Sequence, residues 1–158
     1  MIRKLIDSDR ASIEKILIET KHFNEDEIKV AMELVDIHIN DANQMDYIIH
    51  VYEDDETKNV SGYICYGKRP LTESTYDLYW IAVDANIHGK GIGSSLVRFM
   101  ENDLKKNYNG RLVLIETSGK PSYENERKFY TKNGYDVQTT IKDFYRQGDD
   151  LVVFRKYI

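Results

Sequence analysis

The sequence predicts an α/β domain built on a mixed, mostly antiparallel sheet, with the element order β-α-α-β-β-β-α-β-α-β-β. Helical periodicity occurs in four separate segments, each bounded by cap or turn residues. Between the second and third of these, three runs rich in β-branched and aromatic residues have connections too short for helical crossovers. A nearly continuous apolar run at 111–117 is typical of a central strand covered on both faces.

The N-terminal third is predicted to form one short strand and two helices. Residues 1–6 form the strand, and Asp9 is expected to cap a helix with its apolar face at positions 13, 16 and 17. Asn24 and Glu27 form an Asn-x-x-Glu cap before a second helix with apolar positions 28, 31, 35 and 39.

The next part of the chain is predicted to be a three-stranded antiparallel meander. Its strands are 47–53, 60–67 and 75–83, separated by the polar turn 54–59 and by a loop at Pro70. The short connections place consecutive strands side by side.

The second half alternates helices with strands. A helix opens at the glycines of 89–93 and ends at Asn109-Gly110, and the strand 111–117 follows it. Pro121-Ser122 begins another helix, which ends at Asn133-Gly134. Residues 135–140 and 151–157 form a last antiparallel pair joined around 148–150.

Length and composition predict one globular domain over residues 1–158. The net charge of −5 argues against a nonspecific nucleic-acid binder. The lone Cys65 excludes an intramolecular disulfide and is expected in the core. No run is apolar and long enough for a signal peptide or a membrane span, so we expect a cytoplasmic protein. The four histidines have no metal-ligand spacing, so no metal site is expected.

The most informative segment is a glycine turn between a strand and a helix. It reads Gly89-Lys90-Gly91-Ile92-Gly93-Ser94 and follows the strand residues Trp80-Ile81-Ala82-Val83. Glycines let the backbone approach an anion, and the N–H groups and dipole of a helix N-terminus favour phosphate. A Walker-type site is excluded because Gly91, not Ser or Thr, follows Lys90.

A Rossmann dinucleotide site is the alternative reading of these glycines. Glu116 ends the next strand, roughly where a ribose-binding acid would lie. Against this reading, residues 84–88 separate the strand from the glycines, and the third glycine position falls at Leu96. The neighbouring antiparallel strands also do not form a doubly wound sheet.

Two motifs resemble the GNAT superfamily of N-acetyltransferases. His88-Gly89-Lys90-Gly91-Ile92-Gly93 is similar to the signature Arg/Gln-x-x-Gly-x-Gly/Ala, with His88 in place of Arg or Gln. Phe129-Tyr130-x-x-x-Gly134-Tyr135 is similar to the family's Phe-Tyr-x-x-x-Gly-Phe, and Tyr123 stands where members usually have Asn. The resemblance covers nearly the whole chain and implies a splayed sheet with helices on both faces.

The resemblance also implies an activity and its site. Acetyl-CoA would be the co-substrate, and its acetyl group would pass to a primary amine by direct attack. Tyr130 would protonate the departing sulfur, and either Asp77 or Glu116 would take the amine proton. The implied cofactor-binding residues are Ile81, Ala82, Val83, His88, Gly89, Lys90, Gly91, Ile92, Gly93, Ser94 and Tyr130.

The implied partners are acetyl-CoA and an amine on a small molecule, a peptide or a protein. Neither a nucleic acid nor a membrane is expected, and a monomer and a homodimer both stay open. The alternative from another class of protein is a non-catalytic acyl-CoA-binding module, which would bind acetyl-CoA but turn over no amine.

Overall fold

The computed structural model describes residues 1–87 and 89–158, which divide into two compact units. Unit 1 comprises residues 1–67 and 80–102, and unit 2 comprises residues 68–79 and 103–158. The strands form a seven-stranded sheet in the order β1-β2-β3-β4-β5-β7-β6. This confirms the predicted α/β class with a mixed, mostly antiparallel sheet, while one domain over 1–158 stays a prediction.

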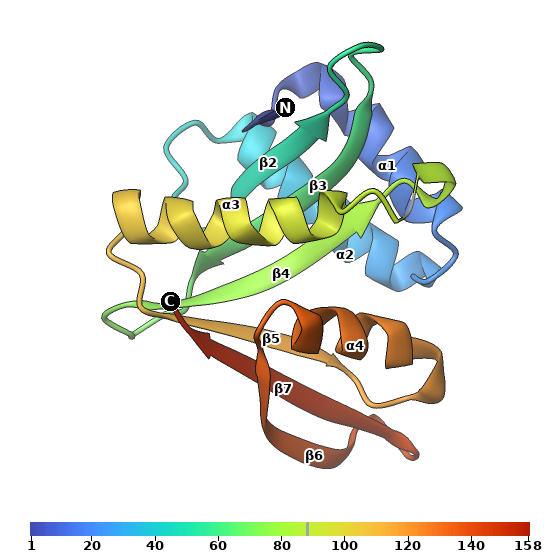
Figure 1. Ribbon diagram of the computed structural model, residues 1–158, viewed down its shortest axis with the longest axis vertical. Helices are drawn as coiled ribbons and strands as arrows, with labels where there is room; N and C mark the ends of the chain where they lie inside the picture. The colour runs from blue at the N-terminus through green and yellow to red at the C-terminus, as the bar shows by residue number, and fades with distance from the viewer. Residues whose placement is uncertain (88) are drawn as a thin grey trace. The chain divides into compact units, whose positions relative to one another are not determined.

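The predicted order of helices and strands is also confirmed. The elements are β1 (Ile2–Lys4), α1 (Arg10–Glu19), α2 (Glu25–Asn40), β2 (Ile48–Glu53), β3 (Val60–Lys68), β4 (Thr75–Val83), α3 (Ile92–Asn107), β5 (Leu112–Ser118), α4 (Glu124–Lys132), β6 (Asp136–Arg146) and β7 (Asp149–Tyr157). Figure 1 shows them in chain order. β4 and α3 each contribute residues to both units.

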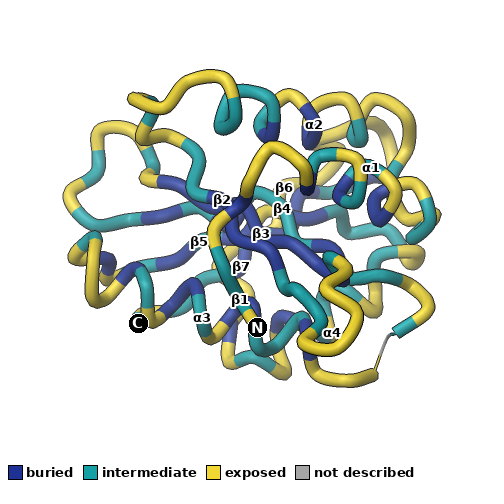
Figure 2. The backbone as a smooth tube through the Cα atoms, turned by 90° about the horizontal axis from the view of Figure 1, so that it is seen from above, coloured by how far each residue is buried: buried dark blue, intermediate teal, exposed yellow. Residues whose placement is uncertain are grey.

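Unit 1 is layered, with its strands between helices. α1 and α2 lie on one face of β2 and β3, and the α3 residues of this unit lie on the other (Figures 1 and 2). The predicted cap of α2 is confirmed, because Asn24 Oδ1 accepts from Glu27 N at 2.9 Å and the Glu27 carboxylate accepts from Asn24 N at 2.8 Å.

The predicted cap at Asp9 is wrong. A 3₁₀ turn over Asp7–Asp9 precedes α1, and no cap hydrogen bond from the Asp9 side chain to α1 is present. Its carboxylate instead accepts from the Arg3 guanidinium at 2.7 and 3.0 Å and from Ile6 N at 3.0 Å. Asp9 is buried, so the charge of Arg3 offsets the cost of removing this carboxylate from water.

The core of unit 1 centres on β3, which Figure 2 shows as buried along most of its length. β3 pairs antiparallel with β2, with Ile49 opposite Cys65, as the meander predicts. Cys65 is almost fully buried, and this burial raises the pKa of its thiol. The prediction that Cys65 is a core residue is therefore confirmed.

Unit 2 is built around β5. β5 pairs parallel with β4, with Asp77 opposite Leu114, and antiparallel with β7, with Ile115 opposite Phe154. Successive side chains alternate between the faces of a strand. Along β5, Val113, Ile115 and Thr117 are buried while Glu116 is exposed, so one face of this strand is less covered than the sequence predicts.

α4 covers the buried face of unit 2. The ring of Tyr130 lies 5.6 Å from that of Phe154 on β7. The helix ends at Lys132, and Gly134 just beyond it has a φ of 85° in the left-handed region, as the predicted Asn133-Gly134 stop requires. Across the residues that the structure describes, no helix combines the length and apolarity needed to cross a membrane.

Candidate active site

The glycine turn lies in unit 1, between β4 and α3. A 3₁₀ turn at Ala85–Ile87 follows β4, and α3 begins at Ile92. Gly89 and Gly91 have φ values of 86° and 75°, which side-chain-bearing residues rarely adopt. A Cβ added at either glycine would meet nothing within 4 Å. Both glycines are therefore required by backbone conformation and face open space.

The first turn of α3 presents backbone N–H groups beside these glycines. Ser95 N donates to Gly91 O at 2.9 Å. The amides of Ile92, Gly93 and Ser94 come earlier in the helix, where no intrahelical acceptor is available to them. Such amides, aligned with the positive end of the helix dipole, can hold a phosphate.

The sequence also predicts Lys90 and His88 as cofactor-binding residues. Lys90 is exposed, so its ammonium group is accessible to an anion. His88 lies outside the described residues. The described groups available to the predicted phosphate site are therefore these backbone amides and the ammonium group of Lys90.

The end of β4 carries the predicted pantetheine partners Ile81, Ala82 and Val83. Ala82 is buried, and a Cβ at Gly62 of β3 would lie only 3.1 Å from Ala82 O. Gly62 therefore permits β3 and this part of β4 to lie close together. The pairing of the β4 backbone with pantetheine stays a prediction, as does the splay of the sheet.

Tyr130 lies in unit 2, where α4 places its ring close to two other aromatic rings. The centroids of Phe129 and Phe154 are 5.5 and 5.6 Å from it. Burial raises the pKa of the Tyr130 phenol, and the negative charge of Glu126 adds to this effect. The phenol is therefore protonated at neutral pH, as a hydrogen-bond donor to a sulfur must be.

The two candidate bases, Asp77 and Glu116, also lie in unit 2, and one arginine joins them. Arg69 Nη1 is 2.8 Å from Asp77 Oδ1 and 3.4 Å from Glu116 Oε1. Asp77 pairs with Leu114 across β4 and β5, and Glu116 lies two residues further along β5. Both carboxylates therefore project from the same face of these strands. We call Arg69, Asp77 and Glu116 the charge triad.

The two carboxylates of the triad differ in their surroundings. The Asp77 side chain is 14% exposed, whereas that of Glu116 is 44% exposed. Burial raises the pKa of Asp77, and the adjacent Arg69 opposes part of that rise. A carboxylate whose pKa moves toward neutrality is the better general base.

Sequence reasoning missed Arg69. The residue stands in the loop between β3 and β4, in no motif, and its importance comes from the pairing of β4 with β5. The available signal was a basic residue close to two acidic positions that lie on one face of adjacent strands. The structure thus adds Arg69 to the carboxylates that the sequence singled out.

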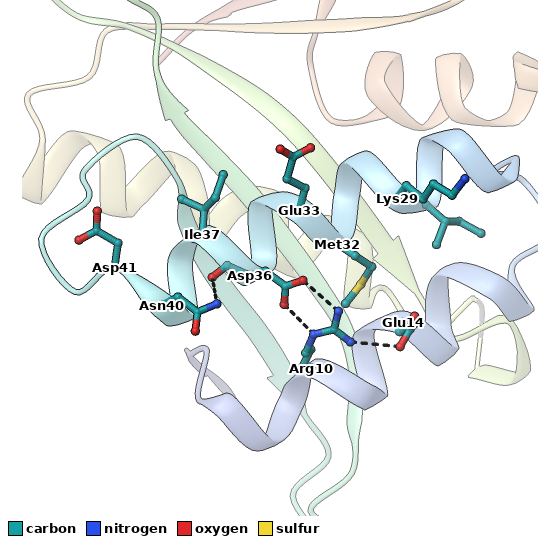
Figure 3. A pocket seen from close by; sticks show the side chains of 10 residues that line it. Arg10, Glu14, Lys29, Met32, Glu33, Asp36, Ile37, Asn40 and Asp41 are labelled. Atoms are coloured by element: carbon teal, nitrogen blue, oxygen red, sulfur yellow. Dashed lines mark hydrogen bonds and ion pairs between the residues drawn. The ribbon is translucent and has the colours of Figure 1, made fainter.

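A separate groove of about 670 Å³ runs along α1 and α2. Figure 3 shows Arg10 pointing toward Asp36 and Glu14 in this groove. None of the predicted cofactor-binding or catalytic residues lines it. Over the described part of the chain, no group of three or more His, Cys, Asp or Glu side chains is arranged to hold a metal ion.

Comparison with known proteins places the chain in a family. Residues 45–137 match the family described as "Acetyltransferase (GNAT) domain". A solved structure from Desulfovibrio desulfuricans, assigned to the GNAT family, is 35% identical, with a TM-score of 0.91 over 99% of this chain and 98% of that one. No curated protein matches significantly.

More distant solved structures share the fold. A ribosomal-protein-alanine N-acetyltransferase from Brucella melitensis is 17% identical, with a TM-score of 0.75 over 100% of this chain and 99% of that one. An aminoglycoside 6'-N-acetyltransferase complexed with coenzyme A is 13% identical, with a TM-score of 0.74 over 99% and 96%. The family match over residues 45–137 and the 35% identical relative show that this chain belongs to the GNAT family of acetyltransferases.

Proposed function

We propose that this protein transfers the acetyl group of acetyl-CoA to a primary amine of a small molecule or a peptide. The observation that carries this proposal is the open turn at Gly89 and Gly91, with its positive φ values, leading directly into α3. Backbone amides at such a turn suit the pyrophosphate of coenzyme A. Membership of an acetyltransferase family supports acetyl-CoA over the dinucleotide alternative.

The proposed chemistry is direct attack without an enzyme nucleophile. The ammonium form of the acceptor loses a proton to a carboxylate, and the nitrogen of the resulting amine then forms a bond to the thioester carbonyl carbon. A backbone N–H near Val83 stabilises the oxyanion of the tetrahedral intermediate. The C–S bond then breaks, the sulfur takes a proton from Tyr130, and the nitrogen gives up its second proton. Starting from the ammonium form, the balance is one amide, one thiol and one proton released to solvent.

Asp77 is our preferred base. Because its pKa is raised, it lies closer to the pKa of an amine than the pKa of an ordinary carboxylate does. Glu116 stays within reach of the same arginine and is the second candidate. Tyr130 contacts Phe154, which pairs with Ile115, so Tyr130 lies on the face of β5 opposite Glu116.

The test is a screen for thiol release from acetyl-CoA over amines, amino acids and peptides, with mass spectrometry of the acetylated product. We expect at least one amine to be consumed, with kcat far above background hydrolysis. Stabilisation by acetyl-CoA without turnover of any amine would contradict the proposal and favour a non-catalytic acyl-CoA-binding module.

Tyr130→Phe is expected to lower kcat by up to about 10²-fold, with little change in the Kd for acetyl-CoA. The thiolate of coenzyme A is already a good leaving group, so the lost proton donor costs less than the upper range for general acids. The phenylalanine keeps the ring that packs against Phe129 and Phe154. Pre-steady-state kinetics and calorimetric titration measure the two quantities, and an unchanged chemical step would make Tyr130 a packing residue.

A further inference from the structure

Arg69 holds both of its carboxylate partners on one nitrogen. Nη1 donates to Asp77 Oδ1 at 2.8 Å and to Glu116 Oε1 at 3.4 Å. Within the described residues, no acceptor lies against Nε or Nη2 of this side chain, which is 41% exposed. The edge of the guanidinium formed by Nε and Nη2 is therefore open.

Two other arginines, Arg10 and Arg3, each donate to one aspartate through two nitrogens. Arg10 donates to Asp36 through Nε and Nη2, at 2.6 and 2.9 Å. Arg3 donates to Asp9 through Nη1 and Nη2, at 2.7 and 3.0 Å. Two parallel bonds are the stronger arrangement for a guanidinium and a carboxylate. Arg69 instead keeps open the same edge that Arg10 uses for Asp36.

The carboxylates of the triad have open positions as well. Asp77 and Glu116 each place one oxygen against Arg69, and the described residues place no donor against Asp77 Oδ2 or Glu116 Oε2. The open guanidinium edge of Arg69 and the open carboxylate oxygens of Asp77 and Glu116 thus lie next to one another on one face of β4 and β5. A ligand that satisfies both must carry both signs of charge.

The backbone of Arg69 is held in place by its loop. Arg69 N donates to Thr75 O at 2.9 Å, and Arg69 O accepts from Thr72 Oγ1 at 2.7 Å. Pro70 follows, and its ring fixes the next φ angle. The base of the side chain is therefore fixed before any ligand arrives, which lowers the entropic cost of binding.

We propose that the charge triad recognises a zwitterionic acceptor, namely a free α-amino acid or a close analogue. The Nε–Nη2 edge of Arg69 binds the carboxylate of the acceptor, and Asp77 with Glu116 binds its ammonium group. Asp77 then takes the proton that frees the nitrogen for attack. This inference rests on the proposed function and names the substrate class of the same site.

Amines without an adjacent carboxylate fit the triad less well. An alkylamine can use only the two carboxylates, and the N-terminus of a peptide presents a neutral carbonyl where an amino acid has a charged group. Either leaves the Nε–Nη2 edge to water. A site built to hydrogen-bond a substrate group discriminates against the analogue that lacks it, although the exposure of Arg69 reduces the effect.

The experiment compares each amino acid with its own amide and with its decarboxylated amine. Measured with acetyl-CoA, kcat/KM is expected to favour the amino acid by roughly 10- to 100-fold over both. The amide is a demanding control, because its amine is the less basic one and more of it is present unprotonated. A preference for the acid over its amide therefore cannot come from the availability of the free amine.

Arg69→Gln is expected to abolish this preference, by lowering kcat/KM for the amino acid while changing that for the decarboxylated amine much less. Arg69 lowers the pKa of Asp77, so the variant is assayed at alkaline pH, where Asp77 stays ionised. Arg111→Gln is the matched control, because Arg111 is exposed immediately before β5 and has no side-chain bond to any described residue. It should keep the preference.

A binding measurement separates the two levels of the proposal. Thermal shift of the coenzyme A-saturated protein should show stabilisation by the amino acid in wild type and none in Arg69→Gln. Equal turnover of acids, amides and amines would overturn the zwitterion proposal and leave the acetyltransferase function intact. Binding of amino acids through Arg69 without any turnover would support the triad as the site and overturn the function. Neither binding nor turnover would overturn both.

Discussion

Asp77→Asn is expected to lower the plateau value of kcat by about 10²-fold or more. The substitution keeps the shape of the side chain and removes the group that takes the amine proton. Because burial raises the pKa of Asp77, its ionised form is disfavoured in the folded protein. Stability linked to this group is present at low pH and is lost as pH rises through the folded pKa. At neutral pH, Asp77→Asn should therefore not reduce the melting temperature.

Asp36→Asn is the matched control for breaking an arginine–aspartate pair. The Arg10 guanidinium lowers the pKa of Asp36, so its stabilising contribution is present above the unfolded pKa and is lost as pH falls through the folded pKa. Asp36→Asn should thus destabilise the protein at neutral pH and leave kcat unchanged. This pattern of stability and activity is the reverse of that expected for Asp77→Asn.

Glu116→Gln decides between the two candidate bases. If Asp77 is the base, wild-type activity falls as pH falls through its raised pKa, and Glu116→Gln keeps this acid limb while Asp77→Asn removes it. Plateau rates within a few-fold of wild type for Asp77→Asn, with a large loss for Glu116→Gln, would transfer the role to Glu116. If both variants are as fast as wild type, either the amine arrives already deprotonated or another group takes the proton.

Gly91→Val is expected to weaken acetyl-CoA binding by roughly 10²-fold or more, measured by calorimetric titration. Hydrogen bonds to a charged group contribute about 1.5–3 kcal/mol each, and the valine side chain would stand in the open space that the pyrophosphate needs. The φ of 75° at this position also makes valine strained, so part of the effect falls on stability.

Gly148→Val separates strain from binding. Gly148 has a φ of 78° and, like Gly91, no atom within 4 Å of an added Cβ, but it lies in the turn between β6 and β7. The two variants should lose similar free energies of unfolding, whereas only Gly91→Val should lose affinity for acetyl-CoA. Equal affinities in both would show that the glycine turn is only structural.

Much of the fold could be predicted because local signals agree with one another. The Asn24–Glu27 box, the stop at Gly134 and the apolar runs of the strands each depend on neighbouring residues only. The cap at Asp9 failed because a distant partner, Arg3, decides where this carboxylate points. Local propensity does not contain that information.

The candidate site shows the same division. Motifs indicated the glycine turn and Tyr130, because the turn conformation and the position of Tyr130 on α4 follow from local structure. Asp77 and Glu116 were found only as alternatives, since sequence does not show that one guanidinium holds both. Arg69 was missed for the same reason, because its role depends on the register between β4 and β5.

Titration of the wild-type protein with acetyl-CoA, and separately with NAD(H), tests whether the glycine turn binds coenzyme A. Acetyl-CoA at 100 times its Kd should raise the free energy of unfolding by about 2.7 kcal/mol, and NAD(H) should leave it unchanged. Stabilisation by NAD(H) with none by acetyl-CoA would contradict coenzyme A binding at this turn and favour a dinucleotide site at Gly89–Gly93.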